Sequence, residues 1–251
     1  MLSTTDDMIL GGRVRLRQPA KGFRSGSDAV LLAAAAHPPA GGRVLELGCG
    51  TGLPLLALAA RRADVDVTGL ELQPGIAAMA AHNIAANGLT GRGRVTCGDV
   101  RCPPFRAAAF DMVIANPPYF DPAKSRRSTD AARDLARAET GAGLADWIDA
   151  AFGMLAPDGH AVFVLRRERL GDVRRAVAGR AGLDVLPLAS VPGKPVKRVL
   201  LRLVPGTAGG VEQPALEMHT ADGGESALAA AIFRQARPIH WSAPCGAPDS
   251  A

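Results

Sequence analysis

The residues best suited to chemistry are Asn116-Pro117-Pro118-Tyr119, which end with the only tyrosine of the chain. An amino group on a purine or an amide is a poor nucleophile because its lone pair is delocalised, so an enzyme must hold both of its N–H groups with acceptors. The side-chain oxygen of Asn116 and the backbone carbonyls of Asn116 and Pro117 can accept, and two prolines remove competing donors and stiffen the turn. Tyr119 adds a flat face for stacking a base. Asn-Pro-Pro is also an ordinary turn after a strand, so the residues upstream must decide between the two interpretations.

A glycine-rich turn follows an earlier apolar strand. Val44-Leu45-Glu46-Leu47 leads into Gly48-Cys49-Gly50-Thr51-Gly52, and Pro54 then starts a helix. The backbone can approach a ligand closely at such a turn. The dinucleotide fingerprint is Gly-x-Gly-x-x-Gly, but Leu53 occupies its last glycine position here, which weakens a pyrophosphate interpretation.

Three acidic residues surround this turn. Glu46 lies at the end of the first strand, Glu71 ends the next strand, and Asp99 ends the third. Glu71 can bind both ribose hydroxyls, Asp99 can accept from an adenine amine, and Glu46 suits an amine or a cation rather than a diphosphate. Together they predict S-adenosylmethionine as the ligand. The competing interpretation is that Glu71 and Asp99 are solvated acids at strand ends.

Strands and helices alternate along the chain, which predicts a parallel sheet covered on both faces. A basic lead-in, Arg13 to Arg24, precedes a helix over Ala29 to Ala36 with Ser27 or Asp28 as its N-cap. The other predicted strands are 43–47, 65–70, 94–96, 110–115, 160–165, a stretch near 185, and 198–204, and the other predicted helices are 54–62, 74–86, 144–155 and 170–181. We expect one domain over residues 1–251, with an N-terminal basic extension and helix (1–40), a catalytic core (41–204) and a C-terminal segment (205–251) that the pattern does not resolve into elements.

Composition limits the class of protein. The chain has 251 residues, 47% of them apolar, and no apolar stretch long enough to cross a bilayer, so we expect a cytoplasmic protein with no membrane partner. Its four cysteines and five histidines show no metal or disulfide spacing, so no metal is expected. A monomer is the default expectation. The net charge of +5 fits a polyanionic partner such as RNA, although all but four of the 29 basic residues are arginines, which codon bias can also produce.

Basic clusters could follow a phosphate backbone, or simply be solvated surface. They are Lys124-Ser125-Arg126-Arg127, Arg133 with Arg137, Arg166-Arg167 with Arg169, and Lys194 with Lys197-Arg198. The first cluster is favoured because it lies close to Tyr119 in the sequence. Trp147, in an apolar-periodic helix, is predicted to belong to the core.

The chain resembles the class I S-adenosylmethionine-dependent methyltransferases of the amino-methylating type, and among them most the bacterial tRNA adenine-N6 methyltransferases. The resemblance rests on the glycine turn, on the segments 21–32, 116–120 and 193–201, and on Arg133, Ala136 and Glu139, and it runs from about Arg13 to Val204. It implies a Rossmann-like seven-stranded sheet in the order 3-2-1-4-5-7-6 with the last strand antiparallel. It also implies S-adenosyl-L-methionine as cofactor and, as substrate, the N6 amino group of an adenine beside the anticodon of a tRNA.

The resemblance, taken with the motifs above, assigns roles by position. Catalysis falls to Asn116, Pro117 and Tyr119. Cofactor binding falls to Glu46, Gly48, Cys49, Gly50, Gly52, Glu71, Leu72, Asp99 and Asn116. Substrate binding falls to Phe23, Phe120, Lys124, Arg126 and Arg127.

Other functions remain open at this point. Enzymes that methylate guanine N2 in ribosomal RNA or the glutamine N5 of a protein share the four-residue motif, although only about forty residues precede the glycine turn and the glutamine enzymes usually carry an N-terminal recognition domain there. A nucleotide- or RNA-binding module without methyl transfer, or an NAD-dependent oxidoreductase, is the alternative from a different class.

Overall fold

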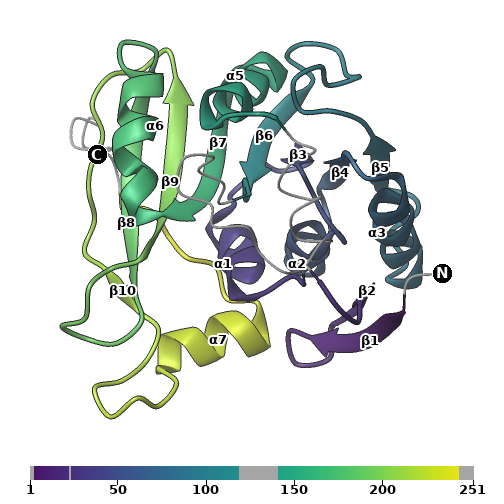
Figure 1. The fold of residues 1–251 in the computed structure, drawn as a ribbon, viewed down its shortest axis with the longest axis horizontal. Coiled ribbons are helices and arrows are strands. Elements are labelled where there is room, and N and C mark those ends of the chain that lie inside the picture. Colours follow the sequence, from purple (N-terminus) through teal and green to yellow (C-terminus); the bar gives the residue numbers. More distant parts are fainter. Residues whose placement is uncertain (1–2, 23, 119–140, 243–251) are drawn as a thin grey trace.

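The computed structural model describes residues 3–22, 24–118 and 141–242 of the chain. Its centre is an eight-stranded sheet in the order β10-β8-β9-β7-β6-β3-β4-β5 (Figure 1). The strands are β3 (Arg43–Leu47), β4 (Asp66–Glu71), β5 (Gly93–Cys97), β6 (Phe110–Ala115), β7 (Leu155–Arg166), β8 (Ala181–Ala189), β9 (Arg198–Pro205) and β10 (Leu216–Glu217). The central strands are continuous apolar runs because both faces of a parallel sheet are covered.

Strands β3 to β7 run parallel, and β9 runs antiparallel between β7 and β8. When β3 to β9 are numbered 1 to 7 in chain order, they lie in the sheet in the order 3-2-1-4-5-7-6, and the antiparallel strand β9 is the last of the seven. The predicted fold class is confirmed, but the predicted number of strands is wrong. The additional strand, β10, pairs with β8 at the edge of the sheet. It has only two residues and lies in a segment rich in Gly and Pro, so it leaves no periodic signal in the sequence.

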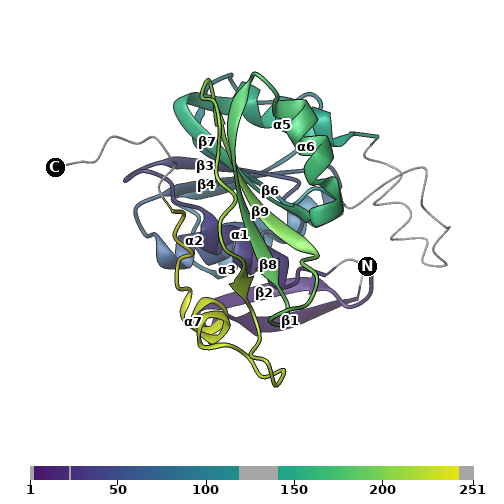
Figure 2. The same ribbon diagram turned by 90° about the vertical axis from the view of Figure 1, so that its left-hand side faces the viewer.

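Helices cover the two faces of the sheet (Figure 2). One face carries α1 (Ser27–Ala35), α2 (Leu53–Arg61), α3 (Pro74–Ala86) and α7 (Ala227–Gln235), and the other carries α5 (Leu144–Met154) and α6 (Leu170–Val177), which follows the short 3-10 turn η1 (Arg167–Arg169). Side chains alternate between the two cores: Val44 and Met112 pack towards the first group, and Leu45 and Val113 towards the second. None of the helices within the described ranges is long and apolar enough to span a membrane.

The first forty residues differ from the prediction. They contain a hairpin of β1 (Thr4–Ile9) and β2 (Val14–Pro19) before helix α1. In β2 the buried Val14 and Leu16 alternate with Arg15 and Arg17. This two-residue repeat is typical of a strand, but the arginines made the segment look like a basic extension without regular structure. The predicted N-cap is also wrong. Gly26 occupies that position without a side-chain bond, and the Asp28 carboxylate instead lies 2.9 Å from Arg198 Nε.

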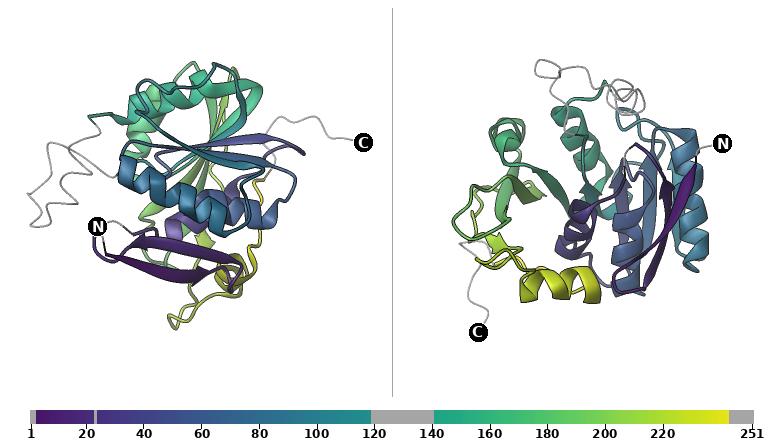
Figure 3. Two further views of the ribbon diagram at one scale, coloured as in Figure 1. Left: turned by 90° about the vertical axis from the view of Figure 1, so that its right-hand side faces the viewer. Right: turned by 60° about the horizontal axis from the view of Figure 1, so that its bottom comes forward.

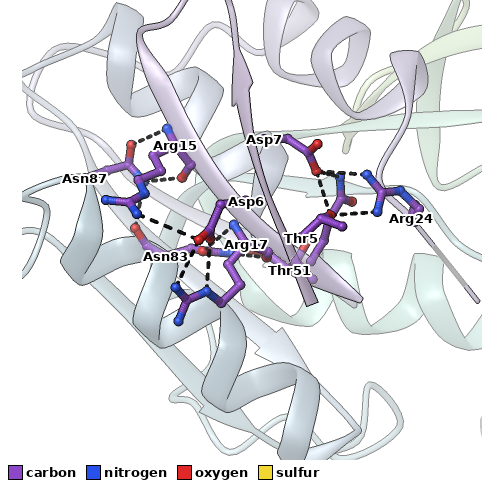
Figure 4. Close-up of polar contacts among 10 residues, drawn as sticks. Thr5, Asp6, Asp7, Arg15, Arg17, Arg24, Thr51, Asn83 and Asn87 are labelled. Atoms are coloured by element: carbon purple, nitrogen blue, oxygen red, sulfur yellow. Dashed lines mark hydrogen bonds and ion pairs between the residues drawn. The ribbon is translucent and has the colours of Figure 1, made fainter. Parts of the chain in front are cut away.

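Helix α3 lies along this hairpin (Figure 3), which is held by Asn83 in the helix and by Asn87, the C-cap one turn later (Figure 4). Asn83 Oδ1 accepts from the Arg17 N–H and Asn83 Nδ2 donates to the Arg17 carbonyl, both at 2.8 Å. Asn87 makes the same pair of bonds with Arg15, at 2.9 and 2.7 Å. Each amide side chain therefore replaces one residue of a neighbouring strand along the free edge of β2.

The C-terminal segment, which the sequence left unassigned, packs on α1 as far as it is described. Ile232 of α7 and Ile239 are buried in the core around α1, and the indole of Trp241 donates to the Ala35 carbonyl at 2.9 Å. His37 Nε2 lies 2.6 Å from the Ile239 carbonyl. These contacts attach the segment to the same face of the sheet as the N-terminal hairpin.

Candidate functional site

The glycine turn after β3 depends on the absence of side chains. Gly48, Gly50 and Gly52 have φ of +63°, +54° and +86°, the left-handed region that L side chains rarely adopt. A Cβ on Gly48 would lie 2.5 Å from Cη2 of the Trp147 ring, which packs directly on the turn. Leu53 then begins α2, with Pro54 in the first turn. The three glycines thus leave the backbone of the turn uncovered beside an aromatic ring.

Glu71, at the carboxyl end of β4, braces this turn from the neighbouring strand. Its Oε2 accepts from the Gly50 N–H and its Oε1 from the Gln73 N–H, both at 2.9 Å. The residue is only 8% exposed, yet it lines a cavity. A carboxylate offers about four lone-pair sites, so Glu71 keeps acceptors for the hydroxyls of a ligand.

Glu46, two residues before the glycine turn, is not among the residues that line the cavity. It is 2% exposed, and its Oε2 has no hydrogen-bond partner among the described residues. Burial and then the nearby Glu71 carboxylate raise the pKa of Glu46 well above its ordinary value, against a backbone hydrogen bond from Leu55. Burial, Glu46 and Glu71 likewise raise the pKa of the Cys49 thiol. A proton on Glu46 relieves the repulsion between two adjacent carboxyl groups.

Asp99 lies beyond the end of β5 on the same cavity. Its carboxylate is 2.5 Å from Nη2 of Arg101 and accepts from the Arg101 N–H at 2.8 Å. The hydrogen bond from the Arg101 side chain lowers the pKa of Asp99, with desolvation acting in the opposite direction. Asp99 is therefore an ionised acceptor held in place by its own neighbour.

Asn116, at the end of β6, lies on the same cavity. Strands β3 and β6 are paired neighbours, with Leu47 opposite Ala115, so the glycine turn and the Asn116 turn leave the sheet side by side. Asn116 Oδ1 is buried without a hydrogen-bond partner in the described part of the chain. A buried acceptor without a partner costs about 1–3 kcal/mol, which a donor on a ligand would remove. Pro118 also lines the cavity, while Pro117 is buried beside it.

The cavity has a volume of about 220 Å³ and brings together part of the predicted set. The predicted residues on its wall are Gly48, Gly50, Glu71, Leu72, Asp99 and Asn116, and those behind the wall are Glu46, Cys49, Gly52 and Pro117. The predictions for Phe23, Tyr119, Phe120, Lys124, Arg126 and Arg127 fall outside the described residues.

Several wall residues were not predicted as part of the site. Lys21 and Gly22 reach the cavity from the end of the hairpin, Gln73 and Ile76 from the start of α3, and Trp147 from α5. Trp147 was expected in the core, and it is buried there while one part of it faces the cavity. Only the position of Gln73, two residues after the acidic end of β4, gave a local signal. In the described ranges no group of His, Cys, Asp or Glu has the geometry to hold a metal ion.

This arrangement can bind a ligand with a diol beside Glu71 and an amine beside Asp99, and can offer the acceptors of Asn116 to a third group.

Comparison with known proteins gives the class of protein to which this fold and site belong. The methyltransferase domain family matches residues 44–139. A protein described as a predicted O-methyltransferase from Agrobacterium tumefaciens superposes with a TM-score of 0.70 at 22% identity, over 85% of this chain and 98% of its own. The fold is that of the class I S-adenosylmethionine-dependent methyltransferases, as the sequence predicted.

Two curated relatives narrow the family. One from Aeromonas hydrophila subsp. hydrophila, a tRNA1(Val) (adenine(37)-N6)-methyltransferase, is 35% identical over 205 residues, which cover 80% of this chain and 84% of the relative. One of the same name from Porphyromonas gingivalis is 32% identical over 208 residues, covering 77% and 79%. The chain belongs to the tRNA1(Val) (adenine(37)-N6)-methyltransferase family.

Proposed function

We propose that this protein transfers a methyl group from S-adenosylmethionine to the N6 amino group of an adenine beside the anticodon of a tRNA. The observation that carries the proposal is the juxtaposition of the glycine turn and Asn116 in one cavity, with the Asn116 oxygen buried and unpartnered among the described residues. The relatives in the family act on position 37 of a valine tRNA by their names. The proposed cellular setting is the cytoplasm and the proposed assembly a monomer.

Cofactor binding is proposed for the wall formed by β3, β4 and β5. The Gly48–Gly50 backbone would approach the ligand, Glu71 would accept from the ribose hydroxyls, and Asp99 from the adenine amine. Bound S-adenosylmethionine supplies an electrophilic methyl group on a sulfonium. The carboxyl group of Glu46 lies behind this wall, so its proposed contribution is to the charge and shape of the turn, or reaches the ligand through water.

Amine binding is proposed for the turn after β6. The Asn116 oxygen and the backbone carbonyls of Asn116 and Pro117 would accept from the two N–H groups of the adenine amine, which orients its lone pair towards the methyl carbon. The nitrogen so held would form the new bond to the methyl carbon, the carbon–sulfur bond would break with its electron pair on sulfur, and the extra proton would leave to water. Catalysis then comes from positioning and acceptor bonds, without a dedicated general base.

The residues outside the described ranges keep their predicted roles as part of this proposal. Tyr119, with Phe120 or Phe23, would stack the adenine after it leaves the RNA stack. Lys124, Arg126 and Arg127 would contact phosphates next to it.

The test is methyl transfer from labelled S-adenosylmethionine to bulk tRNA, followed by digestion to nucleosides. We expect the label in N6-methyladenosine. Asn116→Ala should lower turnover on the order of 10²-fold, as loss of one preorganised polar contact in a transition state does, while calorimetric affinity for S-adenosylhomocysteine changes little. Glu71→Ala should do the reverse and weaken cofactor affinity first. Label in a guanosine or in protein, or full turnover by Asn116→Ala, would refute the proposal.

A further inference from the structure

A second cavity, of about 950 Å³, opens at the same edge of the sheet as the cofactor cavity. Its wall includes Arg166 at the end of β7, Arg167 in η1, and Lys197 and Arg198 at the start of β9. We call this cavity the basic cleft. Its opposite wall comes from α1 and from the C-terminal segment, through Met218, His219 and Phe233.

The basic cleft adjoins the Asn116 turn. Strand β7 pairs with β6, Ala115 lying opposite Phe163, and β9 pairs with β7, Arg166 lying opposite Arg198. Two strand spacings correspond to roughly 10 Å, so β9, the farther of the two strands that carry the basic residues, lies about that far from β6. The segment between β2 and α1 connects the two cavities, since Lys21 lines one and Ser27 the other. A polymer held in the cleft therefore passes close to the proposed amine site.

Positive charge outweighs negative charge on the cleft wall. Among the described residues that line the cleft, four side chains are basic and one, Glu168, is acidic; Glu168 lies 3.9 Å from Arg166. Lys197 forms no ion pair with any residue that the structure describes, and its side chain is exposed. A negatively charged ligand would thus meet a basic rim.

Two of the arginines are held by acids beside the cleft. Arg198 pairs with Asp28 at 2.9 Å, and Arg167 with Glu212 at 2.6 Å. A guanidinium has five N–H donors and one carboxylate engages at most two of them in a fork, so both arginines keep donors for a phosphate. The ion pairs fix the direction of these side chains and lower the entropy that a ligand must overcome.

Much of the remaining cleft wall is apolar, with Ser27, Ser190 and His219 as its other polar residues. Leu31, Leu188 and Met218 are buried, and Val196 and Phe233 are partly buried, all lining the same space. A basic rim over an apolar wall matches a single-stranded nucleic acid, which presents phosphates on one side and flat base faces on the other. Residues 195–198, which the reaction site itself does not use, form part of the rim.

We propose that the basic cleft binds the sugar-phosphate chain of the tRNA next to the adenine that is methylated. This inference rests on the proposed function and adds the path of the substrate. It gives the C-terminal segment a role as one wall of the RNA site, through Met218 and His219 after β10 and Phe233 of α7.

The experiment compares two double charge reversals of the full-length protein. Arg166→Glu with Lys197→Glu changes the cleft, whereas Arg94→Glu with Arg106→Glu makes the same change of net charge at exposed positions that line neither cavity. The probe is an unmodified valine tRNA transcript with adenosine at position 37, titrated over a range of salt concentrations. Thermal unfolding and affinity for S-adenosylhomocysteine are measured on every variant to show that fold and cofactor site persist.

We expect the cleft variant to bind the transcript at least about 10-fold more weakly, with a slope of log affinity against log salt that is shallower by about 1.4, which is two lost contacts at about 0.7 each. The control variant should keep the wild-type slope. Equal losses of RNA affinity in both variants, or no loss in either, would refute RNA binding by the basic cleft. In that case, methylation of the transcript by the wild-type protein would still support the proposed function. Wild-type binding without N6-methyladenosine would refute the function and leave the comparison of the two variants valid.

Discussion

Asn83 offers a sharp test of how the N-terminal hairpin contributes to cofactor binding. Besides its two bonds to Arg17, its Nδ2 donates to the carbonyl of Thr51 in the glycine turn at 2.9 Å, and it is 1% exposed. Thr51 lines the cofactor cavity, and its hydroxyl lies 3.2 Å from that of Ser25. Asn83 therefore connects the hairpin, α3 and the cofactor turn.

Asn83→Ala leaves the Arg17 N–H, the Arg17 carbonyl and the Thr51 carbonyl without their partner. At about 1 kcal/mol or more for each buried group, the free energy of unfolding should fall by on the order of 3 kcal/mol. The Thr51 turn also loses its restraint, so affinity for S-adenosylhomocysteine should fall about 10-fold, equivalent to about 1.4 kcal/mol.

Asn87→Ala is the matched control because Asn87 makes the same two bonds to β2, and its third bond goes to the Asn83 carbonyl within α3 rather than to the glycine turn. Asn87 is partly exposed, so water can replace its bonds and the loss should stay below about 1 kcal/mol. The assays are thermal or urea unfolding and calorimetry with S-adenosylhomocysteine. Equal cofactor affinity in the two variants would refute the proposed connection between Asn83 and the turn.

Three further changes follow from the described contacts. Gly48→Ala places a Cβ against the Trp147 ring at a positive φ and should destabilise the protein by about 1–3 kcal/mol. Adding Trp147→Phe to this variant should recover part of the lost stability. Additive losses of unfolding free energy in the double-mutant cycle would contradict the contact between residue 48 and the Trp147 ring. Glu71→Gln loses one of two backbone hydrogen bonds and should weaken S-adenosylhomocysteine binding about 10-fold by calorimetry, whereas unchanged binding would remove Glu71 from the site. Burial lowers the pKa of His160 to about 4, so the folded state keeps this histidine neutral. The free energy of unfolding should therefore fall by about 3 kcal/mol as the pH drops from about 6.5 to 4. This pH dependence should be flatter in His160→Gln, and parallel curves of unfolding free energy against pH for the two proteins would disprove it.

Much of the central sheet could be predicted because its strands are buried runs with clear ends. Strand β6 and helix α3 occupy the predicted residues, 110–115 and 74–86, since an apolar run marks the first and Pro74 starts the second. The hairpin and β10 were missed for different reasons. The alternation in β2 was masked by its arginines, and β10 is set by pairing with β8 rather than by its own two residues. The single-domain organisation stays a prediction.

The site was predictable where chemistry coincides with the end of a strand. Glu71, Asp99 and Asn116 follow β4, β5 and β6, and parallel strands present their carboxyl ends at one edge. Lys21 and Trp147 reach the same cavity through the docking of the hairpin and of α5, which no local pattern encodes. Glu46 was also predicted at the site; it is buried and is not among the residues that line the cavity. The roles assigned to all these residues stay predictions.

Asn83 and Asn87 can both bond to β2 because the length of one helical turn nearly equals the length of two strand residues. Four residues of helix advance about 6 Å, and two residues of strand about 6.6 Å, so amides one turn apart meet alternate residues of an extended chain. The outer margin of a hairpin, which would otherwise be open to pairing with a second molecule, is thereby closed by a helix instead of a third strand. Placing Asn at positions i and i+4 of a surface helix is a transferable way to protect such a margin in a designed protein.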